Sequence, residues 1–474
     1  HNSRLLNDFL ERIMLETQRF PTFCFQLTLF AFVLVVFASP AAAQEAIDLK
    51  VNFKKGSQNR VVCDFLHSGT VTIPKEETGE IVSLPLSVDA KLSFYQRTTS
   101  DDQTIRFFEK ASGRIKLDRG TTKPELSPAN QLIVARLREK GGDQVELASM
   151  TGILDQVELE LIQNPADPMT LSAVFSRQSV KEGDSWAPSV ESLAKMLRLH
   201  RIEESKVRIL LKKYDSKSAR VYIIGTLLAD VNDVVTEMEL SGIAMIDREN
   251  DSLSSLKLTI RERRGPGQIA PGFDGKTKID IRITDAATDK LSNEALAKYT
   301  GKDNKIRQRV RWQCESGNFS VTYEPRWKMI ASEQDAAVLR FIDGSELLAQ
   351  CNIVQLPSRP TDNPLSLEDY KTEVAKIIAA DENAVLLAAS SLPTLAGDMA
   401  MQVVVGGEEE GVPVNWLYYH VTHGDGRRVT LVFTLAESVA QRVDPIAAQL
   451  VNEFEFEPVP KKIASKKPEV TETK

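Results

Sequence analysis

Apolar and polar residues alternate with a period of two along much of the first half of the chain. The longest run covers residues 84–94, where Leu84, Leu86 and Val88 alternate with Pro, Ser and Asp. This spacing is typical of a strand with one buried and one solvated face. The pattern predicts a large antiparallel sheet, with strands at residues 47–53, 84–94, 207–211, 219–228, 238–246, 256–260 and 279–283 and a hairpin connection at 247–251.

Two segments of this half carry helical signals, at residues 128–140 and 189–199. In the second, Ser189 is placed to cap the helix, and apolar residues at helical spacing follow it. Because an antiparallel sheet with one polar face must cover its apolar face, we expect these helices to lie on the sheet. A sheet that curls into a partly open barrel would instead leave room for an apolar cavity.

An uninterrupted apolar run covers residues 29–38. As a helix it would span about 15 Å at about 1.5 Å per residue, against roughly 30 Å for a membrane core. The small-residue site at 41–43 follows it, which predicts a signal peptide over residues 1–43 that is cleaved after Ala43. We therefore expect an exported protein, periplasmic or extracellular, without a stable membrane span. Because the chain does not begin with Met, residues 1–13 are interpreted as preceding a true start at Met14.

The long alternating strands, the leader and the segment VKEGDSW at 180–186, followed by a helix, resemble the half-barrel domains of LolA- and LppX-type lipoprotein carriers and of related secreted bacterial proteins. The resemblance covers about residues 45–285. In those carriers an apolar concave surface holds acyl chains, so the resemblance implies an apolar or lipid-like ligand for this half. An ordinary packed core without a cavity is the alternative.

The second half begins after a charged segment that is poor in large apolar side chains. We place a linker at 286–309, between a domain at 44–285 and a second domain at 310–458. In the second domain Asp343-Gly344 predicts a hairpin turn, because both residue types tolerate positive φ. Helices are predicted after Ser366, which forms a capping box with Asp369, and from Asp444 with Pro445 at its first position; strands are predicted at 399–405, 414–421 and 428–434.

This order of elements resembles the PsbP-like fold, which extrinsic photosystem proteins, Ran-binding Mog-type proteins and some secretion chaperones share. Residues 319–327, 349–352 and 451–456 carry the likeness. Those relatives mostly bind other proteins, so the resemblance implies a protein-binding module. The predicted fold class is therefore α+β: a curved antiparallel sheet, or half-barrel, with covering helices, followed by a PsbP-like α+β sandwich.

The net charge limits the class of partner, and the positions of the cysteines limit the possible disulfide bonds. The formal net charge of −7 and the lack of a basic, aromatic-laced stripe argue against nucleic acid as a partner. The Lys-rich residues 459–474 contain two prolines and are predicted to be a disordered tail. Outside the leader the cysteines are Cys63, Cys314 and Cys351. Two alternatives remain for them: a disulfide between Cys314 and Cys351, or buried free thiols.

Candidate chemistry is sparse. His420 and His423 form an H-x-x-H motif, but residues three apart on a strand face opposite sides, and a zinc site needs at least three protein ligands. His67 and His200 are isolated, with no nucleophile in a suitable setting. We predict no catalytic residue, no cofactor and no metal, and keep a metal-dependent enzyme as a remote alternative.

The sequence therefore predicts an exported, non-catalytic binding protein that carries an apolar or lipid-like ligand in its first domain. The alternative is a protein–protein adaptor or assembly factor that acts through its second domain. Aromatic residues dominate interface hot spots, so the possible anchors for a partner are Trp327, Trp416, Tyr418 and Tyr419.

Overall fold

The structure is a computed structural model. It describes residues 45–74, 80–138, 145–231, 234–267, 271–299, 308–314, 316–344, 346–379, 383–409 and 411–458. The predicted signal peptide, the tail at 459–474 and part of the predicted linker lie outside these residues. The described residues from Glu45 to Pro458 belong to one compact unit. In the part of the chain that the structure describes, no helix has the length and apolar character needed to cross a membrane.

The predicted α+β class is wrong, because the described chain is mostly β. Strands reach 20 residues in β3 (Ile81–Ser100), whereas helix α7 (Ala440–Asn452) has 13. The helix expected at 128–140 is also wrong. A short 3-10 turn leads there into strand β6 (Leu132–Leu137), where the β-branched Ile133 and Val134 are both fully buried. Such residues favour a strand between two packed layers over a helix.

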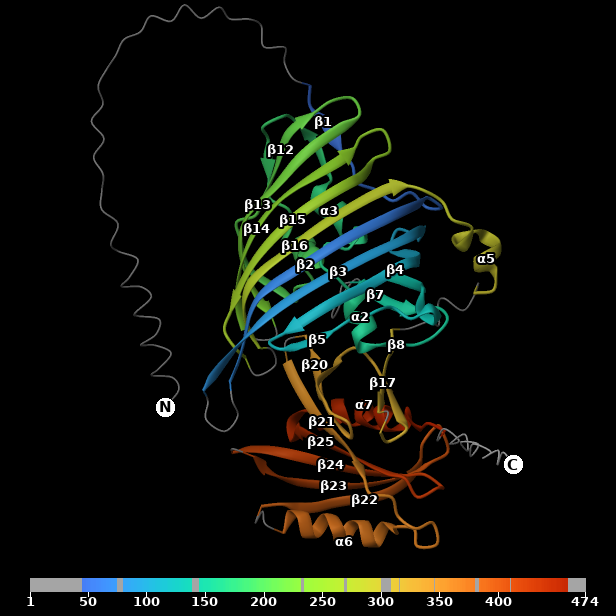
Figure 1. Cartoon of the computed structure of the whole chain (residues 1–474). Helices are drawn as coiled ribbons and strands as arrows, with labels where there is room; N and C mark the ends of the chain where they lie inside the picture. Colours follow the sequence, from blue (N-terminus) through green and yellow to red (C-terminus); the bar gives the residue numbers. More distant parts are fainter. Residues whose placement is uncertain are drawn as a thin grey trace, which may run out of the picture. The chain divides into compact units, whose positions relative to one another are not determined.

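A sheet of thirteen described strands forms most of the first half (Figure 1). Its order is β10-β12-β13-β14-β15-β16-β2-β3-β4-β6-β7, with β11 paired to β13 and β5 paired to β4. All of these pairs are antiparallel, and the sheet does not close on itself. Its other strands are β2 (Gln58–Pro74), β4 (Gln103–Leu117), β5 (Gly120–Thr122), β7 (Val145–Ser149), β10 (Ser185–Trp186), β11 (Arg201–Ser205), β12 (Arg208–Tyr214), β13 (Ser218–Val231), β14 (Val234–Asp247), β15 (Ser252–Arg264) and β16 (Gly272–Asp285).

Helices α2 (Gln156–Ile162), α3 (Pro168–Phe175) and α4 (Val190–Leu197) cover one face of this sheet (Figure 1). The capping role predicted for Ser189 is confirmed, since its side chain accepts a hydrogen bond from the backbone N–H of Ser192. The alternating side chains of the other face point away from the helices. We call the two surfaces the helix-covered face and the open face.

The second half contains a seven-stranded antiparallel sheet between two helices. Helix α6 (Leu367–Ile378) packs on one face and α7 on the other (Figure 1). Ser366 caps α6 as predicted, but α7 begins at Ala440, four residues before the predicted start, with Pro445 inside the helix. The strands, in sheet order, are β19 (Trp327–Ser332), β20 (Ala336–Asp343), β21 (Glu346–Leu356), β25 (Arg428–Ala436), β24 (Val412–Thr422), β23 (Met399–Glu409) and β22 (Val385–Pro393).

The two halves share backbone pairing and buried side chains. Strand β17 (Val310–Cys314) runs parallel to β8 (Leu154–Asp155), with Val310 beside Leu154, and one hydrophobic cluster includes both residues. The described part of the predicted linker holds η2 (Asp289–Leu291) and α5 (Asn293–Ala297). The remaining strands are β18 (Phe319–Tyr323) and β26 (Phe454–Phe456), which extend the sheet of β17, and β1 (Ile47–Leu49) and β9 (Arg177–Val180), which form a separate pair.

Candidate functional site

The open face of the large sheet is hollowed across six neighbouring strands, and the most exposed apolar side chains of the hollow come from β2, β13 and β14. This space, which we call the apolar hollow, has a volume of about 770 Å³. Leu66 on β2, Ile224 on β13 and Ile243 on β14 are 47%, 59% and 43% exposed. Hydrophobic residues that gather in one hollow, unlike single exposed ones, indicate a binding surface. The other lining residues are Asp64, Leu210, Tyr222, Ile223, Ser241, Gly242, Lys257, Leu258, Thr259, Lys278, Ile279 and Asp280.

Strand register explains why the surface is depressed there. One row of register partners crosses the sheet from Ile224 on β13 to Leu66 on β2. Between these two residues the row passes through Ser241, Thr259 and Lys278. Because Ser and Thr have short side chains, the middle of the row lies lower than its apolar ends.

The adjacent row forms one wall of the apolar hollow. Tyr222 is the register partner of Ile243, which in turn pairs with Lys257. The Nζ atom of Lys257 lies 3.5 Å from a carboxylate oxygen of Asp280, so this cation is engaged within the sheet. The wall therefore changes from apolar on β13 and β14 to charged on β15 and β16.

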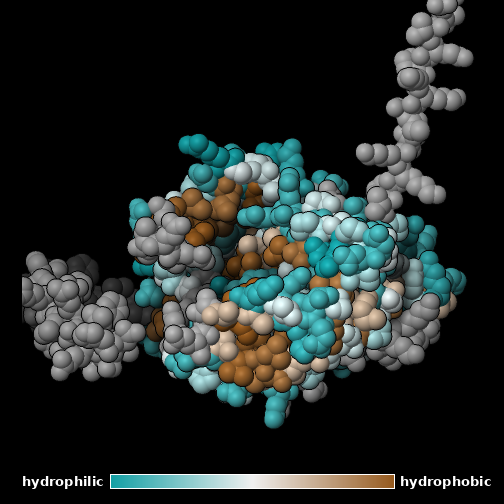
Figure 2. Space-filling view, turned by 90° about the horizontal axis from the view of Figure 1, so that it is seen from below, coloured by the Kyte–Doolittle hydropathy of each residue, from teal (hydrophilic) through white to brown (hydrophobic). Residues whose placement is uncertain are grey.

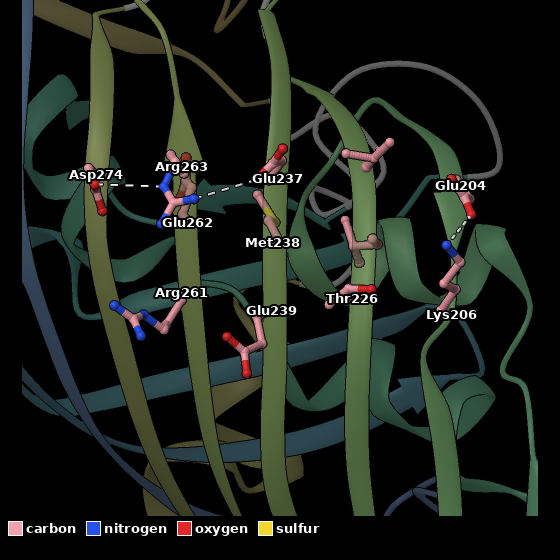
Figure 3. A pocket seen from close by; sticks show the side chains of 12 residues that line it. Glu204, Lys206, Thr226, Glu237, Met238, Glu239, Arg261, Glu262, Arg263 and Asp274 are labelled. Carbon is pink, nitrogen blue, oxygen red and sulfur yellow. Dashed lines mark ion pairs between the residues drawn. The ribbon is translucent and has the colours of Figure 1, made fainter. Parts of the chain in front are cut away.

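A second, charged hollow of about 380 Å³ lies further along β13 to β16 (Figure 3). Arg263 lies between Glu237 and Asp274 and makes an ion pair of 3.8 Å with each of them. At its other side Glu204 pairs with Lys206 at 2.9 Å, and this contact raises the pKa of the Lys206 ammonium. The charged hollow is thus lined largely by residues that already neutralise one another.

Arg261 differs from these neighbours. Its register partners are Glu239 on β14 and Lys276 on β16. Figure 3 shows its side chain directed away from Glu239. Within the described residues Arg261 makes no ion pair with Glu239, and Lys276 carries the same charge as Arg261. Arg261 is exposed, so its guanidinium faces solvent between the two hollows.

The helix-covered face is filled by the protein's own side chains. Val221, Leu240 and Ile279 from the sheet are each at most 2% exposed and belong to one cluster with Phe175 of α3 and Leu193 of α4. From the sequence we expected an apolar ligand on the concave face of the first domain, which is the side that the helices cover. The apolar hollow instead lies on the opposite face of the same strands.

A short signal in the sequence could have pointed to the open face. Residues 221–224 are apolar at four consecutive positions, so two of them must leave the buried face of the strand. Ile243 likewise departs from the alternation of its strand. Such departures from alternation reveal individual exposed hydrophobic side chains. They do not reveal the hollow, because the hollow depends on how these side chains align across neighbouring strands, and the pattern along one strand does not encode that alignment.

His67 lies on the helix-covered side of β2. Its ring stacks on Phe273 with centroids 4.4 Å apart, and its Nδ1 lies 2.8 Å from the hydroxyl of Thr277. Burial, reinforced by the charge of Arg264, lowers the pKa of His67 to about 4. The imidazole is therefore neutral at pH 7 and acts as a packed aromatic ring.

The structure separates the two histidines of the H-x-x-H motif. His420 is buried, with its ring 5.1 Å from that of Tyr370, and burial lowers its pKa to about 4. The Nδ1 of His423 lies 2.6 Å from a carboxylate oxygen of Asp398. His200 lies elsewhere, beside Gly344. No group of three or more His, Cys, Asp or Glu residues that could hold a metal occurs in the described ranges.

The described cysteines are buried free thiols, so Cys314 and Cys351 do not form the disulfide that the sequence left open. Burial raises the pKa of Cys63 to about 12 and raises that of Cys351 strongly. These thiols therefore act as small hydrophobic residues.

The predicted aromatic anchors do not form one exposed group. Trp327 and Tyr419 are 1% and 2% exposed and pack in the main core. Trp416 and Tyr418 point to the other face of β24, where they are partly buried against the cluster under α6. All four thus contribute to packing on the two sides of the second sheet.

Hydrophobic residues also reach the surface elsewhere. The view from below shows several such groups, some of them around a recess (Figure 2). On β22, an edge strand of the second sheet, Val385 and Leu387 are each 59% exposed. In the first sheet, by contrast, Leu66, Ile224 and Ile243 come from interior strands and line one hollow of the open face.

No family model and no curated protein matches the chain. Among solved structures, the chain is similar to the cyanobacterial PsbP protein CyanoP from Synechocystis sp. PCC 6803, with 17% identity over 31% of this chain and 92% of that one and a TM-score of 0.26. It is also similar to the Ran-binding protein Mog1p of Saccharomyces cerevisiae, with 9% identity over 31% and 95% of the two chains and a TM-score of 0.25.

Lipovitellin, in a structure concerned with its lipid–protein interactions, matches 51% of this chain with 6% identity and a TM-score of 0.28. The match covers 27% of the lipovitellin chain. These neighbours include a PsbP protein and a Ran-binding Mog-type protein, the two kinds of protein that the sequence analysis named for the second half, whereas the likeness to LolA-type carriers is not confirmed. Because all three TM-scores are below 0.5, no function follows from them.

Proposed function

We propose that the protein binds an amphipathic, lipid-like molecule on the open face of its large sheet. The observation that carries this proposal is the apolar hollow, where Leu66, Ile224 and Ile243 remain exposed around a space of about 770 Å³. Ligand sites usually measure about 300–1,000 Å³ and are mostly apolar. Each Å² of apolar surface that a ligand removes from water contributes about 25 cal/mol.

The neighbouring charged hollow would orient such a ligand. The rows of Ile224 and Ile243 are apolar where they cross β13 and at Ile243 on β14, whereas the next rows carry Arg261 and Arg263 with their acidic neighbours. A molecule with an apolar chain and a polar end would match both surfaces at once. A purely apolar molecule would use only the first.

The proposed role is binding without catalysis, in an exported protein. The residues that line the two hollows include neither His nor Cys, and the charged ones are largely engaged in ion pairs with one another. The apolar run at 29–38 and the small-residue site after it support export.

The test is a titration of the full chain with N-phenyl-1-naphthylamine, a neutral apolar fluorophore whose emission rises on leaving water. The variant Ile243→Glu places a charge in the apolar hollow and should weaken binding at least tenfold. Val235→Glu is the matched control, because Val235 lies on the same strand and face, is 69% exposed and does not line the hollow. Absence of binding by the unmodified chain, or equal loss in both variants, would contradict the proposal.

A further inference from the structure

Three cationic side chains that have no ion-pair partner among the described residues lie close together at the border between the two hollows. Arg261 and Lys276 are direct register partners on β15 and β16, and Lys278 follows two residues later on the same face. All three are exposed, and within the described residues none of them makes an ion pair or a hydrogen bond through its side chain. Their arrangement brings three positive charges onto two adjacent strands.

Several other cations of the open face are paired with carboxylates. Lys257 contacts Asp280 at 3.5 Å, Arg263 contacts Asp274 at 3.8 Å, and Arg282 contacts Asp64 at 2.9 Å. The carboxylates nearest the three cations are therefore occupied. Glu239 is the exception, and the side chain of Arg261 is directed away from it (Figure 3).

Like charges directly opposite each other on neighbouring strands are destabilising. Arg261 opposite Lys276 is such a pair, and Lys278 adds a third charge beside them. An anion placed among the three would remove this repulsion and would gain charge-assisted hydrogen bonds to them. The position matters, because Lys278 lines the apolar hollow and Arg261 lines the charged one.

We infer that the ligand is a single-chain anionic amphiphile whose carboxylate lies among Arg261, Lys276 and Lys278. This inference rests on the proposed function. Its acyl chain crosses the short side chains of Thr259 and Ser241 toward Ile224. Three strand spacings of about 4.8 Å separate β16 from β13, which gives about 14 Å for the chain.

The test compares three ligands with the same alkyl chain: laurate, dodecanol and dodecylammonium. Each competes with N-phenyl-1-naphthylamine for the full chain, below its micelle concentration and at low ionic strength. Laurate should bind at least tenfold more tightly than dodecanol, and dodecylammonium should be the weakest. Raising the salt concentration should shrink the advantage of laurate, because exposed charges are screened.

The double variant Arg261→Gln/Lys278→Gln should lose the preference for laurate while keeping its affinity for dodecanol. Arg220→Gln is the control, since Arg220 is an exposed cation on the open face of β13 that lines neither hollow. The measurements on the unmodified chain do not depend on the folding of any variant.

The outcomes separate the two proposals. Equal affinity for all three ligands would overturn the anionic head group and leave the amphiphile-binding function standing. Displacement of the fluorophore by none of them, together with no binding of the fluorophore itself, would overturn both. Binding to vesicles of anionic phospholipid without binding of monomeric laurate would overturn the single-molecule ligand in favour of a membrane surface.

Discussion

Arg106 on β4 holds Asp167, the residue that caps helix α3, through two hydrogen bonds of 2.7 and 2.6 Å. The side chain of Arg106 is 1% exposed and that of Asp167 is 10% exposed. The guanidinium also lies over the ring of Phe94, 5.2 Å from its centroid. A charged pair therefore fixes the start of a covering helix against the large sheet.

Removing one partner of this pair should destabilise the protein strongly. We expect Asp167→Ala to lower the free energy of unfolding by about 3–5 kcal/mol, because it leaves a buried guanidinium without its counter-charge. Urea unfolding followed by circular dichroism measures the loss. The control is Arg60→Met, which removes an exposed pair with Glu109 (side chains 40% and 36% exposed) and should cost about 1 kcal/mol or less. Similar losses in both variants would contradict the prediction.

The free energy of unfolding should fall at acidic pH, because two histidines are buried in their neutral form. The pKa values of His67 and His420 are lowered from 6.5 to about 4 in the folded protein, so the unfolded chain binds protons first. The stabilisation is complete above pH 6.5 and is lost as the pH falls toward about 4. The raised pKa of Glu262, which burial causes, acts in the opposite direction.

The measurement is the urea midpoint between pH 7.5 and pH 4. His420→Phe keeps a ring against Tyr370 and should flatten the decline. A slope unchanged by His420→Phe would refute the assignment.

A small residue is required where β2 and β16 pair. Gly275 is the register partner of Gly69, and a Cβ atom at Gly275 would lie 2.3 Å from the ring of Phe273 and 2.5 Å from the carbonyl oxygen of Ser68. We expect Gly275→Ala to cost about 1–3 kcal/mol, because the Phe273 ring must move from its place against His67.

The control for this substitution is Gly265→Ala, since nothing lies within 4 Å of a Cβ atom at that position. Thermal unfolding compares the two variants. A lower melting temperature for Gly265→Ala than for Gly275→Ala would show that crowding at Phe273 is not the cause.

Local sequence signals predicted the strands well. The alternation over 238–246 and 279–283 falls inside β14 and β16, and Ser189 and Ser366 cap helices as expected. The helix start at Asp444 was misplaced because Pro445 is tolerated in the second turn of α7. Leu132 to Leu137 were misread because burial between layers overrides helical spacing.

The candidate site was much less predictable. The sequence pointed to the apolar face that packs on helices, since alternation assigns the other face to solvent. Leu66 and Ile224 lie more than 150 positions apart in the chain, and only the register of five strands places them in one row. Such lateral alignment depends on long-range pairing, which no local pattern specifies.

The parallel contact between Val310 and Leu154 has a consequence for how the chain can be divided. A fragment that ends at residue 285 would leave β8 without a neighbour and would expose part of the shared hydrophobic cluster. A fragment that begins at residue 310 would carry an unprotected strand edge at β17. The two parts should therefore melt together, and neither should be a sound choice for expression by itself.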